Sequence, residues 1–150
     1  MKIKKIYLSG DHAGFKLKEN VKKWLLEKYE VEDIGPLVYD KKDDYPDFVI
    51  PMARKVAKNK NSRGLIIAGS GQGEAITTNK IKGIKAGLYH GGSPKIVKTG
   101  RLHDDINILC MGSRFVSEKE AKRAIDIFLK SKFEGGRHSR RLKKMEKIER

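Results

Sequence analysis

The sequence has one cysteine and no long apolar run. Cys110 cannot form an internal disulfide, and it stands in an apolar segment, which is typical of a reduced core thiol and argues against a zinc site. The lysines near the start lead into an apolar run too short for a signal peptide, and no apolar stretch is long enough to span a bilayer. These absences predict a soluble, cytoplasmic protein with no membrane partner.

Acidic residues are in the minority. The 150-residue chain has 34 Lys and Arg against 19 Asp and Glu, which gives a formal net charge of +15. Most lysines are scattered through amphipathic segments, as on solvated helix faces, but residues 137–150 form a basic cluster. That cluster fits a solvated terminal helix, phosphate binding or RNA affinity. Because aromatic residues that could stack on bases are not interleaved with it, nucleic acid is the less favoured partner.

Short apolar segments alternate with amphipathic ones along the chain. The length predicts a single domain, residues 1–150, in which residues from about 131 to 150 are a basic C-terminal segment. We expect strands at about 2–8, 30–34, 64–68, 85–89 and 107–111. We expect helices at about 17–28, from 46, from 74, at 94–103 and at 118–130. This alternation predicts an α/β fold with a doubly wound five-stranded parallel sheet and helices on both faces.

A glycine-rich loop follows the third predicted strand. Four apolar residues, as in a strand buried on both faces, run into Gly69, Gly71 and Gly73. Glycine permits positive φ and close approach, so successive N–H groups can point at an anion or a developing oxyanion. Ser70 adds a hydroxyl, and Glu74 adds a carboxylate at the start of a helix. The loop therefore fits proton transfer beside a carbonyl, with an ordinary strand-to-helix turn as the alternative.

Polar residues follow three of the predicted strands. Asp11 and His12 come after the first strand, Ser70 and Glu74 after the third, and Arg114 after the fifth. In doubly wound sheets, ligands bind at the carboxyl ends of the strands. We expect these side chains to converge on one edge of the sheet.

Six motifs resemble one known family in order and spacing. They are Gly10-Asp11-His12-Ala13-Gly14-Phe15, Asp44-Tyr45-Pro46, Gly69-Ser70-Gly71-Gln72-Gly73 with Asn79-Lys80, His103, Gly112-Ser113-Arg114, and Glu134-Gly135-Gly136-Arg137-His138 with Arg141. Together they resemble the type B ribose-5-phosphate isomerases, in the sugar-phosphate isomerase family that also holds the galactose-6-phosphate isomerase subunits. The match covers nearly the whole chain, and six motifs in the right order are hard to obtain by chance.

The resemblance implies a fold, an assembly and a reaction. The fold is the same five-stranded doubly wound α/β domain, in a homodimer or a dimer of dimers with active sites shared between subunits. The reaction is a cofactor-independent aldose–ketose isomerisation of a phosphorylated sugar, most simply ribose 5-phosphate to ribulose 5-phosphate through an enediolate. No metal and no cofactor is implied, and the partner molecule is a small sugar phosphate.

Carried over residue by residue, the resemblance implies roles at the sugar end of the site. Asp11 and His12 contact the sugar or its phosphate. The backbone of Gly69–Gly73, together with Ser70, holds the enediolate oxygens. His103 is the acid that opens the furanose ring.

The resemblance also implies a phosphate end, built from Arg114, Arg137, His138 and Arg141. Because Arg137 and Arg141 are four positions apart, they share a face of a helix, and with Arg114 they would form a socket of three guanidinium groups. Arg137 follows the break at Gly135-Gly136. That placement favours a site completed across a dimer interface.

Two positions depart from the family pattern. Many members have a cysteine base where Ala68 stands, but one branch has instead a glutamate at the position of Glu74, which makes Glu74 the expected base. The family usually has asparagine where Asp104 stands in the substrate site. The carboxylate of Asp104 is either neutralised by a neighbour such as Arg101 or contacts a sugar hydroxyl away from the reacting carbons. Tyr45 either lines the sugar site or packs in the core.

Some alternatives stay open at this stage. Burial would raise the pKa of Glu74, whereas its place in the first turn of a helix would lower it. The substrate could be a four-carbon or six-carbon sugar phosphate. A non-catalytic anion- or RNA-binding α/β domain would explain the basic charge, but it does not explain why Asp11, Glu74 and His103 occur together.

Overall fold

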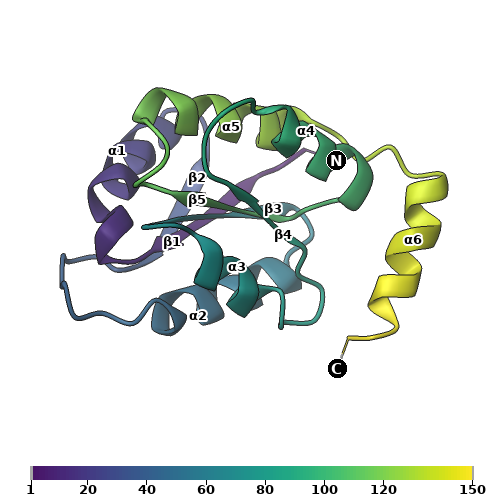
Figure 1. Ribbon diagram of the computed structural model, residues 1–150, viewed down its shortest axis with the longest axis horizontal. Coiled ribbons are helices and arrows are strands. Elements are labelled where there is room, and N and C mark those ends of the chain that lie inside the picture. Colours follow the sequence, from purple (N-terminus) through teal and green to yellow (C-terminus); the bar gives the residue numbers. More distant parts are fainter. Residues whose placement is uncertain (1, 150) are drawn as a thin grey trace.

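The computed structural model describes residues 2–149, and a five-stranded parallel sheet forms its centre (Figure 1). The strands are β1 (Lys5–Gly10), β2 (Glu30–Gly35), β3 (Ser62–Ala68), β4 (Ala86–Tyr89) and β5 (Ile108–Gly112). The helices are the 3-10 turn η1 (His12–Gly14), α1 (Phe15–Leu25), α2 (Pro46–Lys58), α3 (Gln72–Thr78), α4 (Lys95–Asp104), α5 (Glu118–Lys130) and α6 (Arg137–Glu146). The strand order is β2-β1-β3-β5-β4, so the predicted α/β fold is confirmed.

The two faces of the sheet carry two separate hydrophobic cores. Along β3, Leu65 and Ile67 point into the core formed with α1, α4 and α5, while Ile66 and Ala68 point into the core formed with α2. Figure 1 shows the corresponding layers, with α1, α4 and α5 on one side of the sheet and α2 and α3 on the other. A strand covered on both faces has no polar side to alternate with, which explains its unbroken apolar run.

The first strand is longer at its carboxyl end than the sequence predicts. β1 continues through Gly10, and the chain then turns through η1 before α1 begins. A side chain at Gly10 or at Gly14 would overlap the carbonyl oxygen of Ile67. Both glycines therefore let the β1 end and the following turn pack directly on β3, and the Asp11 carboxylate closes the turn by accepting a bond from the Gly14 N–H at 3.0 Å.

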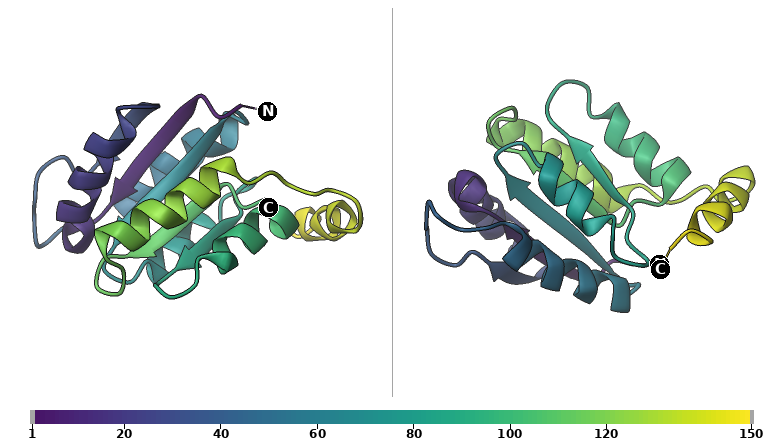
Figure 2. Two further views of the ribbon diagram at one scale, coloured as in Figure 1. Left: turned by 90° about the horizontal axis from the view of Figure 1, so that it is seen from above. Right: turned by 60° about the horizontal axis from the view of Figure 1, so that its bottom comes forward.

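The C-terminal helix lies at the margin of the domain. α6 stands away from the layered body in both views of Figure 2, and it contacts α4. The chain after α6 returns to the body, where Glu149 Oε1 accepts a bond from the Gly83 N–H at 3.1 Å. The basic segment expected after Gly136 is thus a helix in the structure. Among residues 2–149, no helix has both the length and the apolar character needed to cross a membrane.

Candidate active site

The strand order changes direction between β1 and β3, and polar residues gather where these two strands end. In the sheet, β1 lies between β2 and β3. The chain goes from β1 to β2 on one side and then crosses to β3 on the other side. Asp11 follows β1, and Ser70 and Glu74 follow β3. Crevices at such switch points are the usual ligand sites of doubly wound sheets. The structure therefore brings together these residues, which the sequence placed on one edge.

The glycine loop after β3 packs tightly against the side chains of Tyr45 and Arg114. Gly71 adopts a φ of 81°, a left-handed conformation that favours glycine. A side chain at Gly73 would overlap the hydroxyl of Tyr45, which therefore lies against the loop while its ring packs on the α2-side core. At Gly69 an added Cβ would lie 3.2 Å from Cζ of Arg114, whose guanidinium therefore rests against the loop.

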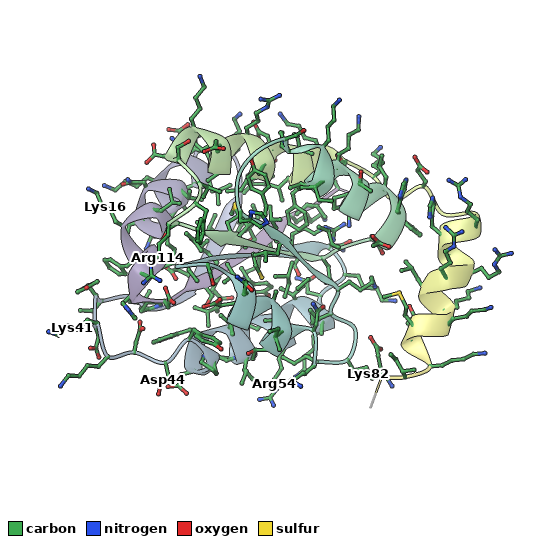
Figure 3. The ribbon with its side chains drawn as sticks, in the orientation of Figure 1. Lys16, Lys41, Asp44, Arg54, Lys82 and Arg114 are labelled. Carbon is green, nitrogen blue, oxygen red and sulfur yellow. The ribbon has the colours of Figure 1, made fainter. Side chains whose placement is uncertain are left out.

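The turn after β5 is hydrogen-bonded to the end of β3 and to the start of the same loop. The N–H of Ser113 donates to the carbonyl of Ala68 at 2.7 Å, and the N–H of Arg114 donates to the carbonyl of Gly69 at 3.1 Å. These bonds place a fully cationic side chain at the carboxyl edge of the sheet, where Figure 3 shows Arg114 on the side away from α6. The loop and Arg114 together suit an anionic ligand.

Glu74 is a buried carboxyl group on this edge. It is 4% exposed, and burial raises its pKa; the neighbouring carboxyl of Asp11 adds to the rise through like charge and a hydrogen bond. A bond from its own backbone N–H lowers the pKa but does not cancel the rise. Burial thus decides the question that the sequence left open. A glutamate with a raised pKa is a better proton acceptor near neutral pH than a free one.

His12 contacts a carboxylate that the sequence did not single out. Its Nδ1 lies 2.6 Å from Oδ1 of Asp43, in the loop before α2. The hydrogen bond with Asp43 raises the pKa of His12, while Arg114 opposes the rise. Asp43 stands in a run of acidic residues beside Asp44. Nothing in one sequence tells which of these carboxylates reaches a histidine 31 positions earlier.

A second cluster lies at the other end of the molecule, between α4 and α6. The rings of His103 and His138 stack with centroids 4.2 Å apart, and Glu134 Oε2 lies 3.5 Å from Nε2 of His138. Both Arg137 and Arg141 are exposed on α6 near this pair. Burial lowers the pKa of His138, and the charges of His103 and the two arginines lower it further.

The ligand atoms of His103, Glu134 and His138 lie within 4.8 Å of one another, the arrangement of a possible cation site. The nearby arginines, however, make the local potential positive, which opposes a cation and attracts an anion. This cluster is therefore better suited to a phosphate than to a metal.

The two clusters are not joined within one chain. Arg114 follows the carboxyl end of β5, whereas His103, near the end of α4, comes shortly before the start of that strand. The three-arginine socket of Arg114, Arg137 and Arg141 is thus not formed by a single copy.

One of the two alternatives for Asp104, neutralisation by Arg101, does not occur in the structure. The Arg101 guanidinium instead bonds Oδ1 of Asp105 at 2.9 Å and the carbonyl of Ile106 at 2.6 Å. Arg101 is buried, and the αL turn at Asp105 brings that carboxylate, one position further on, back to it. Asp104 is exposed beside His103.

Comparisons with known proteins agree with this architecture. A model of the Ribose/Galactose Isomerase family matches residues 6–145. The probable ribose-5-phosphate isomerase B of Mycoplasma genitalium is 42% identical over 146 residues, which are 96% of this chain and 95% of that protein. The ribose-5-phosphate isomerase B of Escherichia coli is 36% identical over 148 residues, covering 98% of this chain and 97% of its own.

A solved structure is similar over the same span. The crystal structure of ribose-5-phosphate isomerase B from Mycoplasma genitalium with bound ribulose 5-phosphate has a TM-score of 0.91 and 40% identity, and the match covers 98% of this chain and 97% of that one. The fold and the site edge define an isomerase of the doubly wound α/β class. The chain belongs to the Ribose/Galactose Isomerase family, and its resemblance to the type B ribose-5-phosphate isomerases is confirmed.

Proposed function

We propose that the protein interconverts ribose 5-phosphate and ribulose 5-phosphate, with Glu74 as the base. The observation that carries the proposal is the buried Glu74, whose pKa is raised, at the exit of a glycine loop. A relative with 40% identity has been crystallised with bound ribulose 5-phosphate, which supports the choice of substrate. Position 68 has no side chain that could carry a proton, so the carboxylate is left as the acid–base group of this loop.

The reaction divides into ring opening and proton transfer. His103 donates a proton to the ring oxygen of the furanose, the bond between that oxygen and C1 breaks, and the C1 hydroxyl gives up its proton to water, which releases the open-chain aldehyde. Glu74 then takes the proton from C2, and the electrons move onto the oxygen at C1 to form an enediolate. Ser70 and the N–H groups of the loop stabilise that charge. The O2 hydroxyl proton moves to the oxygen at C1, and Glu74 returns its proton to C1 as the C2 carbonyl forms, which completes the ketose.

The phosphate end of the substrate requires cations from both clusters. Arg114 supplies one guanidinium at the carboxyl edge of the sheet, and α6 presents Arg137 and Arg141 one helical turn apart. His138 lies beside them and is available as a further donor. Paired guanidinium contacts suit a phosphate dianion, because each group can donate two parallel hydrogen bonds.

A homodimer joins the two clusters into complete sites. Asp11, Glu74 and Arg114 come from one copy, and His103 and the α6 arginines come from the other. Large apolar side chains are exposed on the chain beside α6, including Ile96 at 60%, Met145 at 48% and Ile148 at 82%. Such exposure is costly in a monomer and is typical of an interface.

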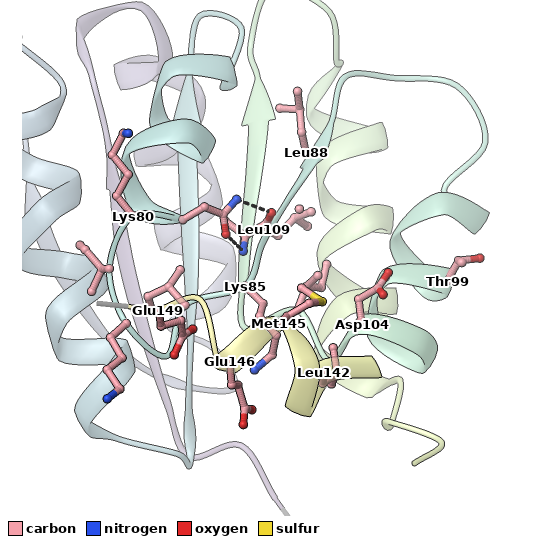
Figure 4. A pocket seen from close by; sticks show the side chains of 18 of the residues that line it. Lys80, Lys85, Leu88, Thr99, Asp104, Leu109, Leu142, Met145, Glu146 and Glu149 are labelled. Carbon is pink, nitrogen blue, oxygen red and sulfur yellow. Dashed lines mark hydrogen bonds between the residues drawn. The ribbon is translucent and has the colours of Figure 1, made fainter. Parts of the chain in front are cut away.

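These side chains surround a groove of about 870 Å³ that runs between α6 and the β4 side of the sheet. Figure 4 shows Leu88, Leu109, Leu142 and Met145 in its wall, with Asp104 at one end. An apolar groove next to an incomplete polar site supports pairing with a second copy, because one contact then buries the groove and completes the site.

A panel of sugar phosphates tests the proposed substrate. We expect the highest kcat/KM for ribose 5-phosphate, with lower values for four-carbon and six-carbon aldose phosphates. A higher value for another sugar would reassign the substrate within the family. If no aldose phosphate were isomerised but RNA bound in a salt-sensitive way, the function would be that of a binding domain.

A further inference from the structure

His12 is held in place by a carboxylate from a distant loop. Oδ1 of Asp43 lies 2.6 Å from the ring Nδ1 of His12, and the same oxygen accepts a bond from the His12 backbone N–H at 3.2 Å. The loop is placed in part by Tyr39, whose ring meets the His12 ring edge-on with centroids 6.4 Å apart. Asp43 therefore fixes both the main chain and the ring of His12.

The Asp43 side chain is withdrawn from water. It is 5% exposed, and its second oxygen, Oδ2, is buried without a hydrogen-bond partner within residues 2–149. A carboxylate buried in this way is unfavourable unless a positive group compensates it. The ring of His12 is in contact with it, and because the His12 side chain is 32% exposed, its opposite side remains open to a ligand.

We propose that Asp43 is a positioning residue, which holds His12 as an oriented cation so that His12 and Arg114 together bind the substrate anion. Nδ1 is occupied by Asp43, and within the described part of the chain no hydrogen bond engages Nε2. The free Nε2–H then donates to the ligand, as in other carboxylate–histidine pairs that orient a working ring nitrogen.

The charges around His12 favour its protonated form. The hydrogen bond and the charge of Asp43 raise the pKa of His12, and Asp11 raises it further. Burial and Arg114 act in the opposite direction, but the pKa still stands above its usual value near 6.5. His12 consequently keeps its charge over more of the neutral range, where the phosphate of a sugar is a dianion.

The first test is an NMR titration of the ligand-free protein, which does not depend on any activity. We expect the wild-type His12 pKa to lie above 6.5 and to fall in Asp43→Asn, because asparagine keeps the shape of the side chain and removes its charge. The matched control is Asp40→Asn, in the same exposed loop, where the carboxylate bonds the backbone of Lys42 instead. An unchanged His12 pKa in Asp43→Asn, or an equal fall in Asp40→Asn, would overturn the assignment of Asp43.

The second test measures kcat and KM for ribose 5-phosphate between pH 6.5 and 9, and here the inference rests on the proposed function. We expect KM of Asp43→Asn to rise roughly 10-fold at pH 8, with a smaller change in kcat, because a charge-assisted contact becomes a neutral one. The rise of KM with pH should begin at a lower pH than in the wild type.

The two tests separate the possible failures. A lowered His12 pKa with an unchanged KM profile would overturn the claim that the His12 charge binds the substrate. An inactive wild type whose His12 pKa still falls in Asp43→Asn would overturn the proposed function but uphold the coupling of Asp43 to His12.

Discussion

The imidazole rings of His103 and His138 stack face to face, with planes 10° apart and centroids separated by 4.2 Å. One ring comes from the end of α4 and the other from the start of α6. The pKa of His138 is lowered by burial and by the neighbouring positive charges, which include His103. A positive charge on the His138 ring is therefore disfavoured in this stack. The stacking joins the expected ring-opening acid to the helix that carries Arg137 and Arg141, so in the proposed dimer both would enter the partner's site as one unit.

Replacing the proposed base tests the chemistry directly. Glu74→Gln keeps the shape of the side chain but removes its basicity, so we expect kcat to fall by roughly 10²–10⁴ with little change in KM. Steady-state kinetics on ribose 5-phosphate measure this. Glu120→Gln, on α5 and outside both clusters, serves as the control for the substitution itself. Retention of most of the wild-type kcat in Glu74→Gln would remove Glu74 from the mechanism.

The same variant should be more stable than the wild type at neutral pH. The folded-state pKa of Glu74 is raised, so its contribution to stability is fully present below the unfolded pKa near 4.3 and is lost as the pH rises through the folded pKa. As the pH rises through the folded pKa, the native state acquires a buried charge that glutamine does not carry. We expect Tm of Glu74→Gln to rise by a few degrees, since about 1 kcal/mol shifts Tm by roughly 2–4 °C in a chain of this size.

Calorimetry at two pH values checks the sign of this effect. At pH 4 the side chain is largely protonated in both states, so the gain in Tm should shrink towards zero. A variant that is less stable than the wild type at pH 7 would contradict the raised pKa of Glu74 in the folded protein.

The exposed Asp104 should weaken catalysis because it places an anion beside His103, close to where the enediolate forms in the proposed dimer. We expect Asp104→Asn to raise kcat on ribose 5-phosphate about fivefold, the equivalent of about 1 kcal/mol for two charges near 4 Å in water. The kinetic assay should be repeated at high salt, where the gain should diminish. A shift of preference towards another sugar would instead identify Asp104 as a specificity residue, and no change in either quantity would place it outside the site.

The thiol should be inert in the folded enzyme. Cys110 is fully buried in β5, and burial raises its pKa well above the usual range, so the thiolate is neither populated nor accessible. We expect an alkylating reagent to leave activity intact and to label the protein only after denaturation, as measured by mass spectrometry. Stoichiometric inactivation of the native protein would contradict this burial.

Much of the fold could be predicted from periodicity, and the reason is clear at β3 and α5. The apolar run of β3 can only be a strand covered on both faces, and α5 has both its apolar stripe and a capping box formed by Ser117 and Glu120. The exact end of β1 was not predictable, because Ser9 and Gly10 look like turn residues. They extend the strand because Gly10 has no side chain to collide with the carbonyl of Ile67.

The candidate site was only partly predictable, because its electrostatics depend on distant contacts. The edge shared by Asp11 and Glu74 follows from the alternation of strands and helices. The balance that raises the pKa of Glu74 depends on how deeply α3 is buried, which no local pattern states. Arg101 does not neutralise Asp104, which was one of two alternatives, because the αL turn at Asp105 directs the neighbouring carboxylate to Arg101. Asp43 was overlooked because its role requires a loop to fold back onto η1.

In the proposed dimer, each site combines Glu74 of one copy with Arg137 of the other. Arg137→Ala alone should raise KM by about one to two orders of magnitude through loss of a charge-assisted contact. Mixing Arg137→Ala with Glu74→Gln subunits, under conditions where subunit exchange is verified by native mass spectrometry, should restore activity at low substrate concentration. Recovery should approach roughly a quarter of the wild-type value, since half of randomly mixed dimers are hybrids with one intact site each. Verified exchange with no activity above that of the separate variants would contradict the shared site.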